Sequence, residues 1–450
     1  MSATPGRPSP SPIWSPTEST RSLPEVHGTV PIPAHAGFWR KFFAFAGPGF
    51  LVAVGYMDPG NWATDLAGGA RYGYTLLSVI MISNFMAILL QALAARLGIA
   101  SGRDLAQACR DRYSRGTTVA LWMGAEIAIA ACDLAEVIGS AVALQLLFGL
   151  PLIWGVCLTA SDVLIILYLQ HHGFRYIEAF VLTLIGVIAA AFAVELWLSR
   201  PDLLAVAHGF LPQAAIVRNR DMFYIAIGIL GATVMPHNLY LHSSIVQTRK
   251  YTDSVASRRE AIDFASLDSA VALMFALFVN AAILIMSAAV FHGSGHQDVA
   301  DITQAYKLLA PLLGTGAASV LFAVALLASG QNATLTGTLA GQVVMEGFIN
   351  IRLRPWLRRL ITRLLAIVPT VIVVAVAGDA GAGPLLILSQ VILSLQLSFA
   401  VFPLVQFTGD PATMGPFASP GWLKGLAWTV AVVIAVLNAW LLYLVAVGGV

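Results

Sequence analysis

Two prolines, each flanked by side chains suited to cation binding, interrupt otherwise apolar segments of this sequence. The first group reads Asp58-Pro59-Gly60-Asn61 and the second reads Met235-Pro236-His237. Proline lacks a backbone N–H and clashes with the preceding helical turn, and glycine is conformationally permissive, so both segments are predicted to unwind there. A carboxylate at bilayer depth is costly and marks a functional position. These residues therefore predict a cation site on two interrupted helices.

The ligand types narrow the choice of cation. Asp58 offers a charged oxygen, Asn61 a neutral oxygen, and Met235 a thioether beside the carbonyls freed around Ala232. Sodium, calcium and magnesium gain little from sulfur, whereas a softer divalent transition ion gains more, which favours Mn(II) or Fe(II). The alternative for Met235 is gap-filling in a helix bundle.

His237 follows the second proline directly. Its charge changes near neutral pH, so it can carry a proton, although a hydrogen-bonded histidine inside a bundle is the alternative. His242 lies about 140° further around the helix and does not share the face of His237. The proton role is therefore assigned to His237.

Three carboxylates share a stripe on one apolar helix. Glu126, Asp133 and Glu136 fall within about 80° of one another at helical spacing. Acids at this depth need water, protons or cations, so a proton relay is predicted. Structural ion pairs with Arg358 and Arg359 are the alternative, and the two interpretations are compatible.

Composition identifies an α-helical membrane protein with many spans. Of 450 residues, 58% are hydrophobic and 11% are charged, against roughly a quarter charged in soluble domains. Uncharged runs exceed the ~20 residues that span a bilayer, and the short alternating segments of a β-barrel are not evident. A net charge of +2 gives no indication of nucleic-acid binding. The cysteines, at 109, 132 and 157, form no metal-type pair.

Residues 1–36, rich in Pro, Ser and Thr, are predicted to form a disordered cytoplasmic tail. Eleven transmembrane helices are predicted to follow it. The transporter domain covers 37–450. Helices 1–5 (about 42–198) and helices 6–10 (about 222–407) form a 5+5 inverted repeat, and helix 11 covers about 423–447. Interrupted helices at matching places of two inverted halves indicate a midplane site in a carrier rather than a pore.

The distribution of positive charge predicts the orientation. Most of the 25 Lys and Arg fall in segments on one side of the predicted spans. The other side holds only Arg71, Arg200, Arg218, Arg220 and Lys307. By the positive-inside rule, the N-terminus is cytoplasmic, and eleven spans place the C-terminus outside the cytoplasm.

The two proline motifs resemble the signatures of Nramp divalent-metal transporters, particularly bacterial proton-coupled manganese transporters. The similarity extends over about residues 40–447 and includes further motifs: Gly68-Gly69-Ala70-Arg71-Tyr72-Gly73, Asp133-Leu134-Ala135-Glu136, a helix containing Gln331, and Ser389-Gln390-Val391-Ile392-Leu393. The resemblance implies the bacterial leucine-transporter fold with alternating access around unwound helices 1 and 6.

The resemblance also implies roles for individual residues. The metal ligands would be Asp58, Asn61, Met235 and the Ala232 carbonyl, with Gln390 approaching in some states. Proton transfer would start at Asp58 and His237 and continue through Asp133, Glu136, Glu126 and the arginines at 358 and 359. Thr233, Asn280 and Asn438 would form an outer gate. A magnesium-transporting branch departs from the pattern at the methionine, which is retained here. Asp162 and Asp379 receive no role.

The predicted function is proton-coupled import of Mn(II) and Fe(II) across the cytoplasmic membrane. The substrates are metal ions and protons, the surroundings are lipid, no cofactor or nucleic acid is expected, and a monomer is expected. A sodium-coupled amino-acid or organic-ion carrier of the same fold is the first alternative. A membrane-embedded protease ranks far lower, because neither His-Glu-x-x-His nor Gly-x-Ser-x-Gly occurs. The protein is therefore not predicted to be an enzyme.

Overall fold

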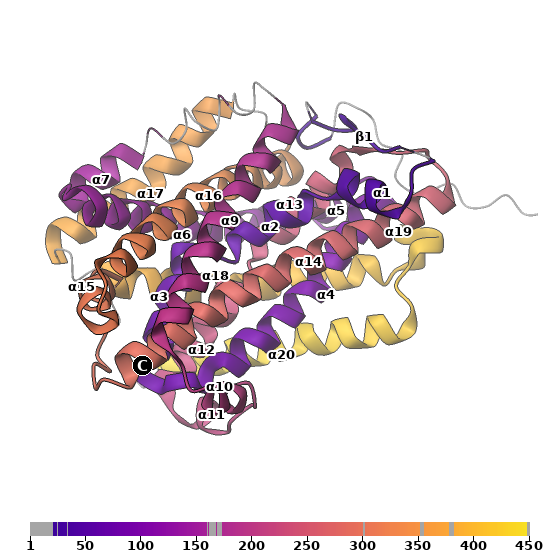
Figure 1. Cartoon of the computed structure of the whole chain (residues 1–450). Coiled ribbons are helices and arrows are strands. Elements are labelled where there is room, and N and C mark those ends of the chain that lie inside the picture. The colour runs from indigo at the N-terminus through magenta and orange to yellow at the C-terminus, as the bar shows by residue number, and fades with distance from the viewer. Residues whose placement is uncertain are drawn as a thin grey trace, which may run out of the picture.

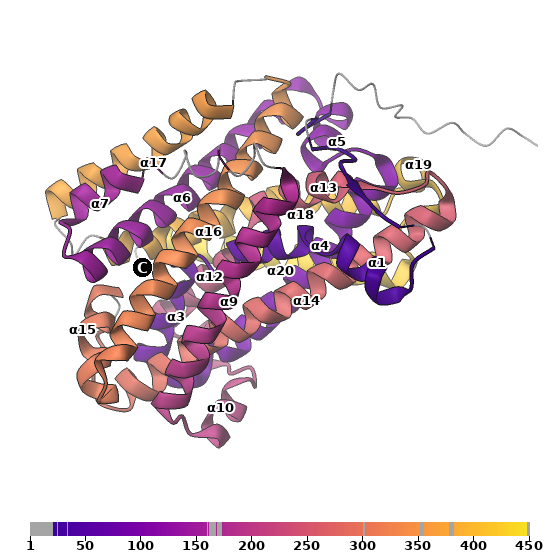
Figure 2. The same cartoon turned by 45° about the horizontal axis from the view of Figure 1, so that its top comes forward.

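The structure, a computed structural model, is an α-helical bundle with one short pair of strands. It describes residues 21–24, 26–33, 35–159, 161, 168, 173–299, 302–351, 355–377 and 382–447. Figures 1 and 2 place β1, α1, α5 and α19 at one end of the bundle, and α10 and α15 at the opposite end.

The first half of the bundle contains the first interrupted helix. Its elements are β1 (Val30–Pro31), α1 (Phe38–Phe45), α2 (Pro48–Gly55), α3 (Pro59–Tyr72), the 3-10 turn η2 (Gly73–Leu76), α4 (Leu77–Ser101), α5 (Leu105–Arg112), α6 (Arg115–Phe148), α7 (Leu152–Thr159) and α9 (Phe174–Ser199). The predicted break in helix 1 is therefore confirmed, between α2 and α3. A further break at Ala46 and Gly47 separates α1 from α2, because Gly47 adopts a φ of 138°.

The second half repeats this plan around the second interrupted helix. Its elements are α10 (Leu203–Gly209), α11 (Ala215–Arg218), α12 (Arg220–Thr233), α13 (Pro236–Ile245), the 3-10 turn η3 (Val246–Thr248), β2 (Arg249–Lys250), α14 (Val255–Ser287), the π turn η4 (Ala288–His292), α15 (Ile302–Leu313), α16 (Gly316–Ile349), α17 (Pro355–Ala377) and α18 (Ala382–Thr408). After these come α19 (Pro411–Met414), the 3-10 turn η6 (Gly415–Phe417) and α20 (Gly421–Ala446). The break predicted at Ala232–His237 lies between α12 and α13.

Eight helical segments among the described residues are long and apolar enough to cross a membrane. They include α6, α9, α14, α16, α18 and α20. The count of eleven remains a prediction, since part of predicted helix 4, including Asp162, lies outside the described residues, as does Asp379. Many apolar side chains face outward, such as Phe85, Trp197 and Val376, as expected for a surface covered by lipid.

Part of the predicted disordered tail lies against the folded bundle. Among the described residues of this range, Val30 and Pro31 pair with Arg249 and Lys250 in a parallel two-stranded sheet. The side chains of Leu23 and Val30 are buried. Composition indicated disorder because prolines dominate this stretch, but two apolar residues are enough to attach it to the bundle.

Glycines allow the central helices to approach closely. A Cβ on Gly139 of α6 would lie 2.2 Å from the Pro59 ring, and one on Gly231 of α12 would lie 2.1 Å from the Gln390 carbonyl oxygen of α18. Small residues at helix crossings are the usual means of tight packing in membranes. These two contacts fix α6 and α18 against the broken helices.

Candidate metal centre

The first break is stabilised by the carboxylate that the sequence singled out. Asp58 is the N-cap of α3, and its Oδ1 accepts hydrogen bonds from the backbone N–H and from Nδ2 of Asn61, both at 2.8 Å. Pro59 occupies the first helical position, where its missing N–H costs nothing. Oδ2 of Asp58 is buried with no hydrogen-bond partner in the described part of the chain.

The second break is also followed by proline but has a different cap. Val234 leaves the helical region with φ −109° and ψ 70°, and Met235 is the N-cap of α13, but its side chain accepts no backbone N–H of that helix. The Met235 side chain is fully buried and packs with Cys132 and Leu393. Its sulfur lies 3.6 Å from Nδ2 of Asn238.

Three oxygens from the two breaks converge on one point. Nδ2 of Asn61 donates to Asp58 Oδ1 at 2.8 Å, to the Ala232 carbonyl at 3.1 Å and to the Gly55 carbonyl at 3.4 Å. The amide nitrogen thus occupies the centre of an oxygen cluster. Rotation of the amide would present Oδ1 of Asn61 as a fourth oxygen to a cation at the same place.

The sulfur of Met235 lies beside this oxygen cluster. A Cβ added to Gly55 would lie 3.1 Å from the Met235 sulfur, and the same glycine supplies a carbonyl to the cluster. Gly55 was missed by sequence reasoning. Only its place three residues before Asp58, at the end of a helix whose last carbonyls lack partners, could have indicated it.

Gln390 reaches the first break from α18. A Cβ on Gly60 would lie 1.8 Å from Nε2 of Gln390, so this side chain lies directly on the start of α3. Nε2 donates to Ser389 Oγ at 2.9 Å, and Oε1 is buried without a hydrogen-bond partner among the described residues. Gln390 therefore stands next to the cluster, with one oxygen available.

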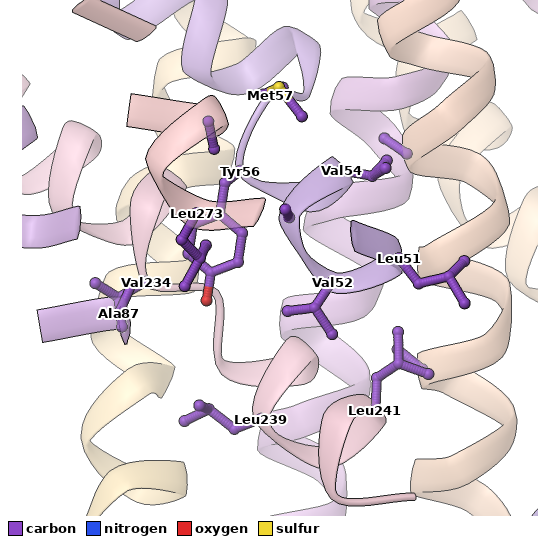
Figure 3. Close-up of a cluster of buried hydrophobic side chains, with 14 of the residues drawn as sticks. Leu51, Val52, Val54, Tyr56, Met57, Ala87, Val234, Leu239, Leu241 and Leu273 are labelled. Atoms are coloured by element: carbon purple, nitrogen blue, oxygen red, sulfur yellow. The ribbon is translucent and has the colours of Figure 1, made fainter. Parts of the chain in front are cut away.

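Apolar packing surrounds the two breaks. The side chains labelled in Figure 3 come from the breaks and from α2, α4, α13 and α14, and all belong to one buried cluster. The chemical groups of the site share this burial: Asp58 and Met235 are 0% exposed, and Asn61 and His237 are 1% exposed. Because bulk water is excluded, a cation bound here must be coordinated by protein groups or by a few enclosed waters.

A second polar network joins the end of α2 to α4 and α13. Gln91 Nε2 donates to the Tyr56 hydroxyl at 2.7 Å, and Gln91 Oε1 lies 3.0 Å from Nδ1 of His242. Sequence reasoning assigned no role to these residues. The structure shows that His242 faces α4, whereas neither ring nitrogen of His237 has a hydrogen-bond partner in the described chain. The two histidines thus occupy different surroundings, as their angular separation predicts.

The acidic stripe on α6 faces α16. A Cβ on Gly337 would lie 3.0 Å both from Oδ1 of Asp133 and from Oε1 of Glu136, so the two carboxylates are adjacent. Cys132 Sγ donates to Glu136 Oε1 at 3.6 Å. Glu126 is half-buried and accepts from Nε1 of Trp122 at 3.0 Å. The side chains at 358 and 359 of α17 lie outside the described residues.

The three residues of the suggested outer gate lie on three helices and make different contacts. Asn280 Nδ2 donates to the Tyr56 carbonyl at 2.8 Å and to Asn61 Oδ1 at 3.3 Å, so it contacts the site directly. Thr233 is the last residue of α12 and is buried. Asn438 instead bonds to Ser394 of α18, with its Nδ2 2.6 Å from the Ser394 carbonyl.

Comparisons with known proteins identify the class of transporter. The family model of Natural resistance-associated macrophage protein-like (Nramp) proteins matches residues 49–444. The chain therefore belongs to the Nramp family, as the two proline motifs predicted. It is a multi-pass membrane protein with the bacterial leucine-transporter fold.

Individual relatives cover nearly the whole chain. A protein of Nostoc sp. named Divalent metal cation transporter MntH is 62% identical over 95% of this chain and 97% of its own length. One of the same name from Listeria welshimeri is 61% identical over 96% of both chains. A crystal structure of the Eremococcus coleocola manganese transporter is 44% identical, with a TM-score of 0.87 over 93% of this chain and 90% of that one.

A more distant structure shares the fold alone. Mhp1, a nucleobase-cation-symport-1 family transporter, is 14% identical and superposes with a TM-score of 0.59 over 88% of this chain and 92% of its own. At this identity the likeness carries no information on the substrate.

Proposed function

We propose that this chain imports Mn(II), and also Fe(II), across the cytoplasmic membrane by alternating access, coupled to inward movement of protons. The observation that carries the proposal is the convergence of three oxygens, from Asp58, Gly55 and Ala232, beside the sulfur of Met235. Oxygen ligands alone suit calcium or magnesium, and the thioether adds preference for a softer divalent ion.

The proton part of the proposal rests on the buried acids. Asp58, Asp133 and Glu136 are at most 4% exposed, and His237 lies one residue beyond the second proline. Such groups are stable in an apolar interior only when they are protonated, paired or bound to a cation. We assign proton movement to His237, Asp133, Glu136 and Glu126, with the arginines at 358 and 359 as charge partners.

The positions of the arginines indicate which end of the bundle faces the cytoplasm. The arginine-rich segments 96–115 and 249–259 lie at the end of the bundle that carries β1, α1 and α5 (Figure 1). By the positive-inside rule, this end faces the cytoplasm. The α10 and α15 end faces outward, and metal enters from there.

Uptake by the full chain in proteoliposomes tests the proposal. Mn(II) uptake should accelerate when the outside is acidified, Fe(II) and Cd(II) should compete, and excess Mg(II) or Ca(II) should not. Uptake that ignores the proton gradient would make the protein a uniporter. Uptake of an organic substrate that depends on Na⁺ would favour the alternative carrier of the same fold.

A further inference from the structure

A segment before the first helix lies across the cytoplasmic end of the bundle. We call its described residues, 21–24 and 26–33, the strap. The Gly28 N–H donates to the Gln247 carbonyl and the Ile32 N–H donates to the Lys250 carbonyl, both at 3.0 Å. These bonds flank the parallel pairing of β1 with β2. The strap is therefore attached to the chain that continues directly from α13.

The beginning of the strap is attached to different helices. The Leu23 N–H donates to Oε2 of Glu346, near the end of α16, at 3.0 Å. Nε2 of Gln107, on α5, donates to Ser22 Oγ at 3.2 Å. The Leu23 side chain is 3% exposed and belongs to the main apolar cluster.

The backbone of Leu23 indicates that this attachment is specific. Its φ is 49°, in the left-handed region that a leucine rarely adopts. Such a conformation is strained for a leucine and persists only where the surroundings stabilise it. Burial of the Leu23 side chain and the hydrogen bond to Glu346 stabilise this conformation.

The strap thus connects the cytoplasmic halves of both broken helices to two other elements. It leads into α1 and α2, and its strand pairs with the segment after α13. Both α2 and α13 pack against α16, to which the strap is also attached. In transporters with this architecture, one group of helices moves against another around the central site. The strap crosses the boundary at which α2 and α13 would leave α16.

We propose that the strap is a latch that keeps the cytoplasmic side of the metal site closed. Its detachment from Glu346, Gln107 and β2 accompanies movement of α2 and α13 away from α16. The proposal rests on the proposed transport function, because it concerns release of metal toward the cytoplasm. In this proposal the strap affects which side of the metal site opens, but none of its residues coordinates the metal.

Hydrogen exchange on the full chain in lipid nanodiscs, without metal, tests the latch. Leu23→Ala removes the buried anchor, and Ile32→Pro removes the N–H that donates to Lys250. Both variants should speed amide exchange about tenfold in 236–245 and 48–55, leaving α6 and α12 unchanged. Thr29→Ala is the matched control, since Thr29 is exposed and, among the described residues, its hydroxyl bonds only to the Val26 carbonyl within the strap.

Two outcomes would overturn the latch. Faster exchange confined to the strap would make it a passive surface segment, and faster exchange that extends to α6 would make it a general contributor to stability. Mn(II) uptake is measured separately on the same preparations. If the wild-type protein takes up no metal, the proposed function fails, whereas the exchange result still decides whether the strap restrains α2 and α13.

Discussion

The two breaks have the same backbone plan but different side chains at the same position. In each, an extended N-cap residue precedes a proline that starts the next helix. At the first break the N-cap is Asp58, whose carboxylate accepts the Asn61 N–H. At the second it is Met235, whose side chain caps no backbone N–H of α13; its sulfur accepts from Asn238 Nδ2 at 3.6 Å. The Asp58 carboxylate therefore both caps a helix and can bind a cation, whereas the Met235 thioether can bind a cation but caps no helix.

Because of this difference, the first break supplies the negative charge of the site and the second supplies its selectivity among metals. The positive end of α3 and the Asn61 amide already stabilise the Asp58 carboxylate, so the first break supplies a prearranged negative charge for any small cation. The sulfur of Met235 adds little for hard cations and more for soft ones. The first break should therefore control whether metal is transported, and the second should control which metal is transported.

Removing the charge should have the largest effect. Asp58→Ala should reduce Mn(II) uptake at least about 100-fold, because the site loses its only first-break carboxylate and α3 loses its cap. Radiolabelled uptake in proteoliposomes measures this. Asp298→Ala, which alters an exposed acid in the loop after η4, should transport normally. Near-normal uptake by the Asp58 variant would remove Asp58 from the site.

Removing the sulfur should change selectivity more than rate. Met235→Ala should retain partial Mn(II) transport while its discrimination against Ca(II) and Mg(II) falls about tenfold, which corresponds to about 1.4 kcal/mol. Competition assays measure the ratio. Met286→Ala, on α14, removes an equally buried methionine away from the breaks and controls for the cavity. Equal selectivity in both variants would refute the role of the thioether.

A methyl group between the two breaks should have a smaller effect. In Gly55→Ala the new Cβ would lie 2.3 Å from Asn238 Nδ2 and 3.1 Å from the Met235 sulfur, so both side chains must move. Mn(II) affinity should fall about threefold to tenfold, measured by calorimetry. Gly186→Ala on α9, where a Cβ meets nothing within 4 Å, should bind normally. Unchanged affinity in the Gly55 variant would show that the Met235 sulfur and the oxygen cluster do not form one metal site.

The prolines should matter least. Each occupies the first helical position, where alanine is also accepted, so Pro236→Ala should lower stability by less than about 1 kcal/mol. Pro59→Ala should cost more, because the Pro59 ring packs on Gly139. Thermal unfolding in detergent compares the two variants. A larger loss for Pro236→Ala would mean that the second break, rather than the first, depends on proline for its shape.

From the sequence, residue type alone singles out some members of the candidate site. Asp58 and Met235 stand out because a carboxylate and a thioether beside proline are unusual in apolar helices. The Gly55 carbonyl could not be predicted in this way, since every residue carries a carbonyl and only the path of the backbone selects one. The Tyr56–Gln91–His242 network was missed for a similar reason, because its members lie on three separate elements.

For the fold as well, local sequence patterns predicted the helices and their breaks, but not the contacts between residues far apart in the chain. Apolar runs located the eight candidate spans that the described residues contain, and prolines located the breaks between α2 and α3 and between α12 and α13. The start of α14 at Val255 was not predicted, because its first turns are polar and project beyond the apolar stretch. The attachment of Leu23 depends on Glu346, more than three hundred residues away, and periodicity contains no information on such a pair.

The hydrogen bonds of Arg249 should determine how the end of the bundle that carries α1, which we propose faces the cytoplasm, opens. Its guanidinium makes five hydrogen bonds: to the Phe45 carbonyl from Nε and Nη2, to the Ala46 carbonyl, to Thr248 Oγ1 and to Glu178 Oε1. A partial displacement of α1 would leave buried donors and acceptors unsatisfied at a cost that the remaining bonds do not offset. Intermediate positions are thus disfavoured, and the opening should be an abrupt, two-state step rather than a gradual widening.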